Sequence, residues 1–179
     1  NRIPKQVLME AVKNVEKNSG MEFTPHVSHR LSDVDFLSAL FYPVGDTYVL
    51  GPKIGRILSR IGWKTTPLKV ANITHAKSHM RAVALGLEKS TSFIPVVRRL
   101  VSRILELTED TTPDAMPREM RFKAMASRKH EANAETFAFV MERYNISMMT
   151  IINQERKLGD IELTSQLRDF VGNYEYDVS

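Results

Sequence analysis

Apolar residues recur every three or four positions along most of this chain, and that spacing is typical of amphipathic helices. The first such stretch predicts a helix over residues 4–18, with Pro4 in its first turn and Gly20 at its end. The same pattern predicts a series of later helices, one of them capped by Thr91 or Ser92. These helices are expected at residues 72–88, 91–107, 118–129, 133–144, 147–157 and 163–171. A short basic helix is expected at residues 53–62 because Lys53, Arg56 and Arg60 are close to helical spacing.

A different pattern lies between the first helix and residue 53. Runs rich in β-branched and aromatic residues at 34–42 and 47–50 flank the polar pair Gly45-Asp46, which predicts a β-hairpin. Pro25 limits residues 21–31 to an irregular or edge strand. This order of elements predicts an α+β fold in which the helices gather at the C-terminal end.

Three further features bear on the core and its boundaries. The stretch 108–117, rich in Thr, Asp and Pro, predicts a linker. The apolar stripe of 133–144 and the pair Met148-Met149 are expected to be helical core. Trp63 is expected to anchor the core, with stacking on a nucleic-acid base as the alternative.

The composition is that of a globular protein. Of its 179 residues, 42% are hydrophobic and 26% are charged. A chain of this length can form one domain with a hydrophobic core. The chain has no cysteine, which excludes disulfides and thiolate metal sites. No apolar run reaches the roughly 20 residues of a membrane span. The chain opens with Asn-Arg-Ile-Pro, without an initiator Met or a signal-peptide pattern, so we expect a piece of a longer protein.

The net charge of +4 is unevenly distributed. Residues 51–104 hold 11 Lys and Arg against the single acid Glu88, whereas residues 1–50 and 105–179 have net charges of −1 and −5. Such a segment creates a positive field that favours a polyanion as partner. The alternative is a basic surface that acids elsewhere in the fold neutralise.

The turn Gly45-Asp46-Thr47 is compared first with a metal-binding Gly-Asp-Asp turn, in which both carboxylates bind metal ions. Here Thr47 stands in place of the second acid, and Pro43 would disturb the central strand that such a turn needs. An ordinary hairpin turn is therefore predicted.

Two residue pairs also have a spacing that suits a cation. Asp33 and Asp35 would share one face of a strand, although such a pair is more often a solvated strand entrance. His75 and His79 lie four apart on a predicted helix, but Lys77 lies between them and the stretch lacks the Glu of an HExxH motif. A helix face near RNA is the favoured interpretation of the two histidines.

Several motifs resemble, in their order, the end of the palm and the thumb of RNA-dependent RNA polymerases of positive-strand RNA viruses. In that family a helix and strand called motif D follow the catalytic Gly-Asp-Asp turn, and a β-hairpin called motif E, the primer grip, leads into a helical thumb. Residues 4–18 followed by 20–24 resemble motif D. The run Asp35-Phe36-Leu37-Ser38, followed by Phe41-Tyr42-Pro43, resembles the Phe-Cys-Ser start of motif E, with Leu in place of Cys.

The run Val-Leu-Gly-Pro-Lys-Ile-Gly-Arg at residues 49–56 resembles the exit from motif E into the thumb, and residues 142–146 resemble a late thumb helix. The resemblance spans most of the chain and is most specific over residues 33–63. It implies a C-terminal palm portion at 1–52 and a helical thumb at 53–179.

The resemblance implies an RNA-directed RNA polymerase whose metal-binding carboxylates and fingers lie upstream of this chain. The chain alone is therefore expected to be inactive and to bind no metal, while Mg²⁺ or Mn²⁺ serves the full polymerase. The implied partners are template and product RNA, nucleoside triphosphates and the rest of the polymerase. The implied location is the host cytoplasm, in viral replication complexes or virions.

The resemblance also assigns site residues. His26 and His29 lie where motif D places a basic residue, usually Lys, near the incoming nucleotide, and either is a candidate general acid toward the departing pyrophosphate. Surface polar residues are the alternative for both. Ser38 is expected to hydrogen-bond the primer backbone. The basic residues expected to contact RNA phosphates are Lys53, Arg56, Arg60, Lys64, Lys77, Arg81, Arg98 and Arg99.

Two functions from other classes remain open. A non-enzymatic RNA-binding module would explain the basic segment equally well, and so would a structural or interaction subdomain that meets an acidic partner. Neither explains the Phe-x-Ser start of the hairpin together with its Gly-Pro-Lys-x-Gly-Arg exit. A polymerase palm and thumb is therefore the favoured hypothesis.

Overall fold

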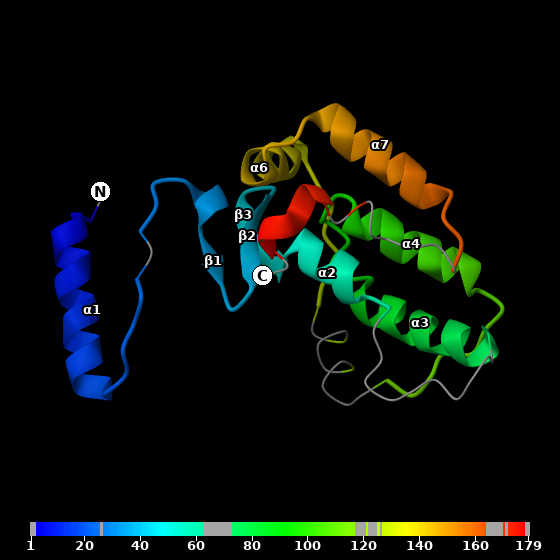
Figure 1. Ribbon diagram of the computed structural model, residues 1–179, viewed down its shortest axis with the longest axis horizontal. Helices are drawn as coiled ribbons and strands as arrows, with labels where there is room; N and C mark the ends of the chain where they lie inside the picture. Colours follow the sequence, from blue (N-terminus) through cyan, green and yellow to red (C-terminus); the bar gives the residue numbers. More distant parts are fainter. Residues whose placement is uncertain are drawn as a thin grey trace. The chain divides into compact units, whose positions relative to one another are not determined.

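The computed structural model shows two compact units, residues Asn1–Val34 and Asp35–Ser179 (Figure 1). The residues that the structure describes are 3–25, 27–62, 73–116, 121, 125, 127–163, 170 and 172–177. In this part of the chain there are six α-helices and one three-stranded antiparallel sheet, so the predicted α+β class is confirmed. The division into palm and thumb at residue 52 stays a prediction.

The first unit contains helix α1, Lys5–Ser19, as the apolar spacing predicts. Pro4 precedes it, and Gly20 ends it in the left-handed conformation at φ 68°, which suits a residue without a Cβ. None of the α1 side chains is buried. After α1, the backbone amide of Phe23 donates to Glu16 Oε1 at 2.9 Å.

The irregular strand expected at 21–31 is wrong for the residues that are described there. Residues 21–25 and 27–30 have no strand pairing, and a 3₁₀ helix, η1 (Leu31–Asp33), follows them. Ser28 and Arg30 both donate to Asp33 Oδ2, at 2.8 and 3.0 Å. The backbone amide of Arg30 donates to Ser28 Oγ at 3.1 Å, so a local side chain, and not a neighbouring strand, is the partner of this amide.

The second unit opens with a meander of three strands, β1 (Asp35–Phe36), β2 (Ala39–Val44) and β3 (Thr47–Pro52). The predicted hairpin is confirmed: Val44 pairs with Thr47 across Gly45-Asp46, and Gly45 has a φ of 58°. The single strand predicted at 34–42 is wrong, because the chain reverses at Leu37-Ser38 and divides it into β1 and β2.

The helices of the second unit pack behind this meander. They are α2 (Ile54–Arg60), α3 (Ile73–Leu87), α4 (Val97–Leu107), α6 (Ala134–Tyr144), α7 (Met148–Gly159) and the 3₁₀ helix η2 (Gly172–Asp177). Helix α4 packs between α3 and α7, α6 contacts β2, and η2 contacts α2 (Figure 1). The helices predicted at 53–62, 72–88, 133–144 and 147–157 are confirmed, and each observed end lies within two residues of the predicted one.

Helix α4 begins six residues later than the predicted helix 91–107. Pro95 has no amide hydrogen to donate, and Val96 has a φ of 71°, outside the helical region. Thr91 does not cap α4; its hydroxyl donates to the Leu87 carbonyl at 2.9 Å and so belongs to the end of α3. Most of the helices expected at 118–129 and 163–171, the loop that includes Lys64, and Trp63 lie outside the described residues.

One core runs through the second unit. Tyr42 of β2 is fully buried, with ring centroids 5.6 Å from Phe93 and 5.3 Å from Phe139 of α6. The α6 stripe is buried at Phe139 and Val140, as predicted. The prediction for the methionine pair is wrong: Met148 and Met149, in the first turn of α7, are 37% and 63% exposed, and the core-facing residues of this helix are Ile151, Gln154 and Leu158.

The predicted linker lacks helix or strand over 108–116. It is nevertheless held against α3, since Arg81 Nη1 donates to the Thr108 carbonyl at 2.8 Å and Asp114 N donates to the Ser78 carbonyl at 3.0 Å. Among the helices described, none combines the length and the apolar character that crossing a membrane requires.

Candidate nucleic-acid interface

An open groove of about 710 Å³ lies beside the sheet of the second unit and is lined by described residues. Its walls are the β1–β2 turn, the end of β3, one side of α2 and the end of α3. Leu37, Leu50, Ile57 and Leu87 form the apolar part of this lining, which we call the apolar floor. We call this cavity the hairpin groove.

Three of the residues assigned to RNA contact come together in the hairpin groove: Ser38, Arg56 and Arg60. Ser38 belongs to the turn between β1 and β2, and the two arginines lie one helical turn apart on α2. No described residue of the lining is acidic. Neither arginine forms an ion pair within the part of the chain that the structure describes. Among the described residues, the groove therefore offers two guanidinium groups without an ion-pair partner and a hydroxyl over an apolar floor.

The start of α2 is fixed by an ion pair. Lys53 precedes the helix, and its Nζ lies 2.7 Å from Asp35 Oδ2 of β1. The Lys53 side chain is only 13% exposed. Lys53, expected to bind phosphate, thus holds α2 to the sheet.

The expected phosphate ligands on α3 also have protein partners. Lys77 Nζ lies 3.5 Å from Asp110 Oδ1, and Arg81 donates to the carbonyls of Leu105 and Thr108 at 3.4 and 2.8 Å. These contacts hold the segment after α4 against α3. The pKa of Asp110 is lowered by a hydrogen bond from Thr111 and by the nearby charge of Lys77.

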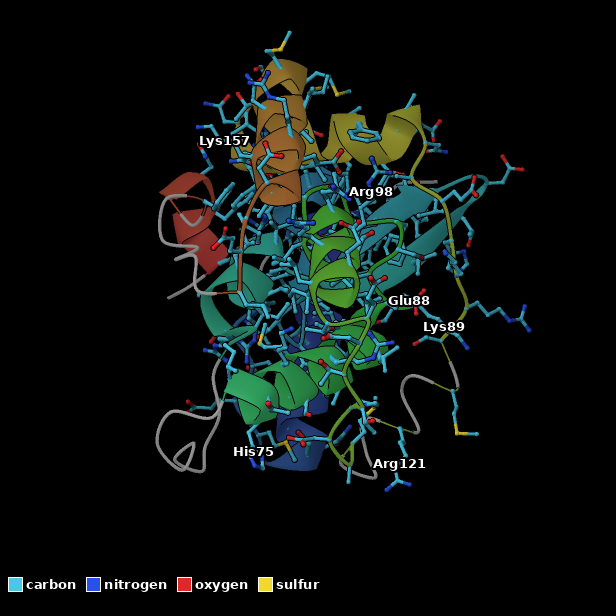
Figure 2. The ribbon with its side chains drawn as sticks, turned by 90° about the vertical axis from the view of Figure 1, so that its right-hand side faces the viewer. His75, Glu88, Lys89, Arg98, Arg121 and Lys157 are labelled. Carbon is cyan, nitrogen blue, oxygen red and sulfur yellow. The ribbon has the colours of Figure 1, made fainter. Side chains whose placement is uncertain are left out.

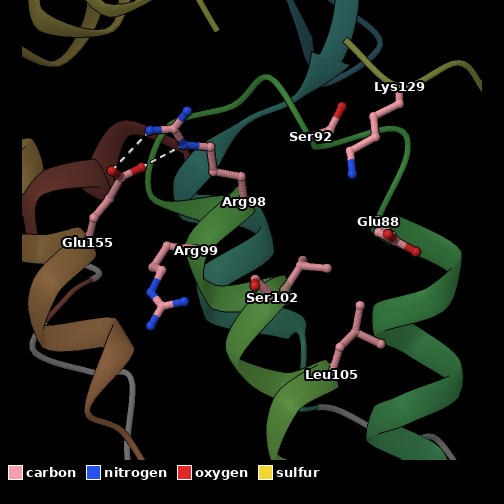
Figure 3. Close-up of a pocket in the computed structure, with 9 residues that line it drawn as sticks. Glu88, Ser92, Arg98, Arg99, Ser102, Leu105, Lys129 and Glu155 are labelled. Carbon is pink, nitrogen blue, oxygen red and sulfur yellow. Dashed lines mark hydrogen bonds and ion pairs between the residues drawn. The ribbon is translucent and has the colours of Figure 1, made fainter. Parts of the chain in front are cut away.

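The expected ligands on α4 line a second cavity, of about 410 Å³, between α4, α7 and the end of α3 (Figure 3). Figure 3 shows the Arg98 guanidinium facing the Glu155 carboxylate, with donor–acceptor distances of 2.9 and 3.1 Å. Arg99 Nη1 donates to Glu106 Oε1 at 2.9 Å. Because both arginines are paired with acids, this cavity is a weaker site for a polyanion than the hairpin groove.

Glu106 is shared between two arginines. Arg103 Nη1 lies 3.2 Å from its Oε2, while Arg99 binds its Oε1. The hydrogen bond from Arg103, with help from Arg99, lowers the pKa of Glu106. This carboxylate lies outside the basic segment 51–104 and neutralises part of it.

The basic segment is therefore much less positive on the surface than in the sequence. Acids from other segments pair with Lys53, Lys77, Arg98, Arg99 and Arg103. Along one side of the second unit, Lys157, Arg98 and Lys89 lie on separate elements and do not form one stripe (Figure 2). Charge neutralisation, the alternative left open by the sequence, thus applies to most of the described basic residues outside the groove.

The expected histidine sites remain scattered. His26 lies outside the described residues, and His29 is exposed in the first unit. His75 is exposed at the start of α3 (Figure 2), whereas His79 Nε2 is buried without a hydrogen-bond partner in the described part. Within the described ranges, no three His, Asp or Glu side chains gather into a possible metal site.

The sequence did not indicate the apolar floor of the groove or the hydroxyls of Ser90 and Ser127 in its lining. Comparison of this chain with protein-family models, curated proteins and solved structures finds no match.

Proposed function

We propose that this chain is the primer-grip and thumb region of a viral RNA-directed RNA polymerase and holds template–product RNA. One observation carries the proposal: Ser38, Arg56 and Arg60 share a groove at the junction between the meander and the first thumb helix. The motif E resemblance assigns the hairpin at 34–50 to the 3′ end of the growing strand, and Arg56 and Arg60 to phosphates of the product strand. The β1–β2 turn and α2 are the two walls of the groove that carry these polar groups.

The chemistry of the groove suits an RNA backbone. Arginine binds phosphate with two parallel hydrogen bonds, and contacts of this kind set position without reading sequence. The apolar floor of Leu37, Leu50 and Ile57 accommodates the less polar face of a ribose or base. In polymerisation the groove would place the terminal hydroxyl, and placement supplies much of the catalysis of phosphoryl transfer.

The outer face of the meander has exposed apolar residues, as expected if this chain packs against the rest of a polymerase. Phe41 pairs with Leu50 and Pro43 with Tyr48 on this face, and Leu50 and Tyr48 are 48% and 64% exposed. Exposed apolar surface of this kind marks an interaction site. In this proposal RNA occupies the groove at the Leu50 end of this face, while the rest of the polymerase covers the Tyr48 end and supplies the metal-binding carboxylates. The complex works in replication complexes of the host cytoplasm.

The first test measures binding of duplex RNA by this chain over a range of salt concentrations. Arg56→Ala with Arg60→Ala should weaken binding to all sequences alike and lower the salt slope by about 0.7–0.9 for each lost phosphate contact. The matched control is Lys89→Ala with Lys129→Ala, which removes two exposed charges outside the groove. Equal effects of the two double variants would mean that the groove is not the RNA surface.

A second experiment distinguishes a polymerase from a non-enzymatic RNA-binding module. The chain alone should incorporate no nucleotide, whereas its coding sequence should continue upstream into a Gly-Asp-Asp turn. In that longer protein, Ser38→Ala should lower single-nucleotide extension of a primed template more than it lowers RNA affinity. Loss of affinity in proportion to extension would favour a non-enzymatic RNA-binding module.

A further inference from the structure

A buried carboxylate near the C-terminal end of the chain holds the start of α2. Asp177 of η2 is 4% exposed, and its Oδ2 accepts the backbone amide of Gly55 at 3.0 Å. The same oxygen accepts the Tyr144 hydroxyl at 2.7 Å, and the Tyr144 oxygen in turn accepts the amide of Ile54 at 3.3 Å. Two of the first amides of α2, which have no partner within the helix, are therefore satisfied by residues far away in the sequence.

This polar cluster is locked into the core by aromatic packing. The ring of Tyr174 meets that of Tyr144 edge-on, with centroids 4.7 Å apart, and both residues are buried. The Tyr174 hydroxyl donates to Gln154 Oε1 of α7 at 2.6 Å. Helix η2 thus forms hydrogen bonds to α2, α6 and α7, and these bonds hold it in one position against the three helices.

Gly55 is a necessary part of this arrangement. A Cβ at this position would overlap the Tyr174 carbonyl oxygen and lie 2.8 Å from the Tyr174 Cβ and 2.9 Å from the Asp177 Cβ. Glycine lets the backbone of η2 approach α2 closely enough for Asp177 to reach the amide.

The contacts that hold the start of α2 also affect the hairpin groove, because α2 forms one of its walls. Helix α2 has only seven residues, and its side chains Arg56, Ile57 and Arg60 form one wall of the groove. Such a short helix is marginal by itself and takes its orientation from its tertiary contacts. A change at its first amides would move both guanidinium groups.

We propose that η2 is an intramolecular clasp, and that Asp177 is a positioning residue that holds Arg56 and Arg60 at the hairpin groove. The contacts of Asp177 fix the start of α2 whether or not the groove binds RNA, and the effect on RNA binding rests on the proposed function. The clasp makes the groove sensitive to any partner or modification that displaces η2.

The clasp itself is tested by amide hydrogen exchange of the whole chain. Asp177→Asn and the milder Tyr144→Phe should each speed exchange over residues 54–60, while exchange in α4 stays unchanged. Thr108→Val is the control, since it also removes one buried hydroxyl hydrogen bond, to the Ile104 carbonyl, and has no contact with this cluster. If neither Asp177→Asn nor Tyr144→Phe speeds exchange over 54–60, or if Thr108→Val does so equally, the clasp is overturned.

The consequence for RNA is tested by a double-mutant cycle. Asp177→Asn should weaken duplex RNA binding roughly 3- to 10-fold, the size expected for a misplaced charged hydrogen bond. In the Arg56→Ala, Arg60→Ala background the same substitution should have no further effect, because the groups that it positions are absent. General destabilisation would instead weaken binding in both backgrounds, and that result would overturn the positioning role. If the unaltered chain binds no RNA, the proposed function fails, and hydrogen exchange alone decides the clasp.

Discussion

At the scale of single residues, the turn between β1 and β2 is the most unusual part of the groove. Leu37 and Ser38 have φ angles of 51° and 64°, which is the left-handed region that β-hairpin turns of type I′ require. Asn and Gly adopt this conformation readily, whereas other residues lose about 1–2 kcal/mol in it. Leu37 is also 83% exposed. Strained, exposed residues of this kind are concentrated at functional sites.

Replacing this turn by Leu37→Asn with Ser38→Gly should therefore stabilise the chain. We expect the free energy of unfolding to rise by about 1–2 kcal/mol, because the new residues take positive φ at less cost. Urea denaturation measures the change. Gly45→Ala, at the other hairpin turn with a φ of 58°, is the control and should lower stability. A lower stability of the Asn-Gly variant would show that Leu37 and Ser38 are not strained.

At the scale of elements, Glu155 and its partner Arg98 together link α7, α4 and α6. Its Oε1 accepts the amide of Val96 at 3.0 Å, directly before α4, and its carboxylate binds the Arg98 guanidinium. The Arg98 guanidinium lies 5.3 Å from the centroid of the Phe137 ring on α6. One carboxylate on α7 thus stabilises a start of α4 that lacks a side-chain cap of its own.

Glu155→Gln should lower the free energy of unfolding by about 1–2 kcal/mol, because a neutral amide oxygen replaces a charged acceptor that two donors share. Thermal or urea denaturation measures this loss. Glu142→Gln is the matched control, since Glu142 is exposed on α6, and a change within about 0.5 kcal/mol is expected there. Equal losses in the two variants would mean that Glu155 does not link the helices.

At the scale of the whole molecule, buried phenols set the response to alkaline pH. Burial raises the pKa of Tyr42, Tyr144 and Tyr174 above the usual value of 10.0, and the charge of Asp177 adds to this effect in each case. Below that value the phenols are protonated in both the folded and the unfolded chain. Above it the unfolded chain releases its protons first, so the free energy of unfolding falls as the pH rises.

Each tyrosine that is protonated only in the folded state should add about 1.4 kcal/mol per pH unit to this fall. Denaturation curves between pH 9 and 11 would measure it. Tyr42→Phe should make the decline shallower, whereas Tyr48→Phe should leave it unchanged because Tyr48 is 64% exposed. The same slope in both variants and in the unaltered chain would contradict this origin of the alkaline sensitivity.

The sequence by itself determined the features that depend on local pattern. Periodicity located five helices, and Gly45-Asp46 located a hairpin turn, because helix spacing and turn chemistry are properties of neighbouring residues. The groove residues Ser38, Arg56 and Arg60 were also named from the sequence, since they lie within one short stretch.

Tertiary structure alone decided which charges remain available and what holds α2. The acids that neutralise Arg98 and Lys77 lie 57 and 33 residues away along the chain, and Asp177 lies 122 residues from Gly55. No local pattern encodes such partners, because ion pairs and buried hydrogen bonds form between whichever side chains the packed helices bring together. The start of α4 was likewise set by a carboxylate on α7 and by the positive φ of Val96, neither of which apolar spacing can indicate.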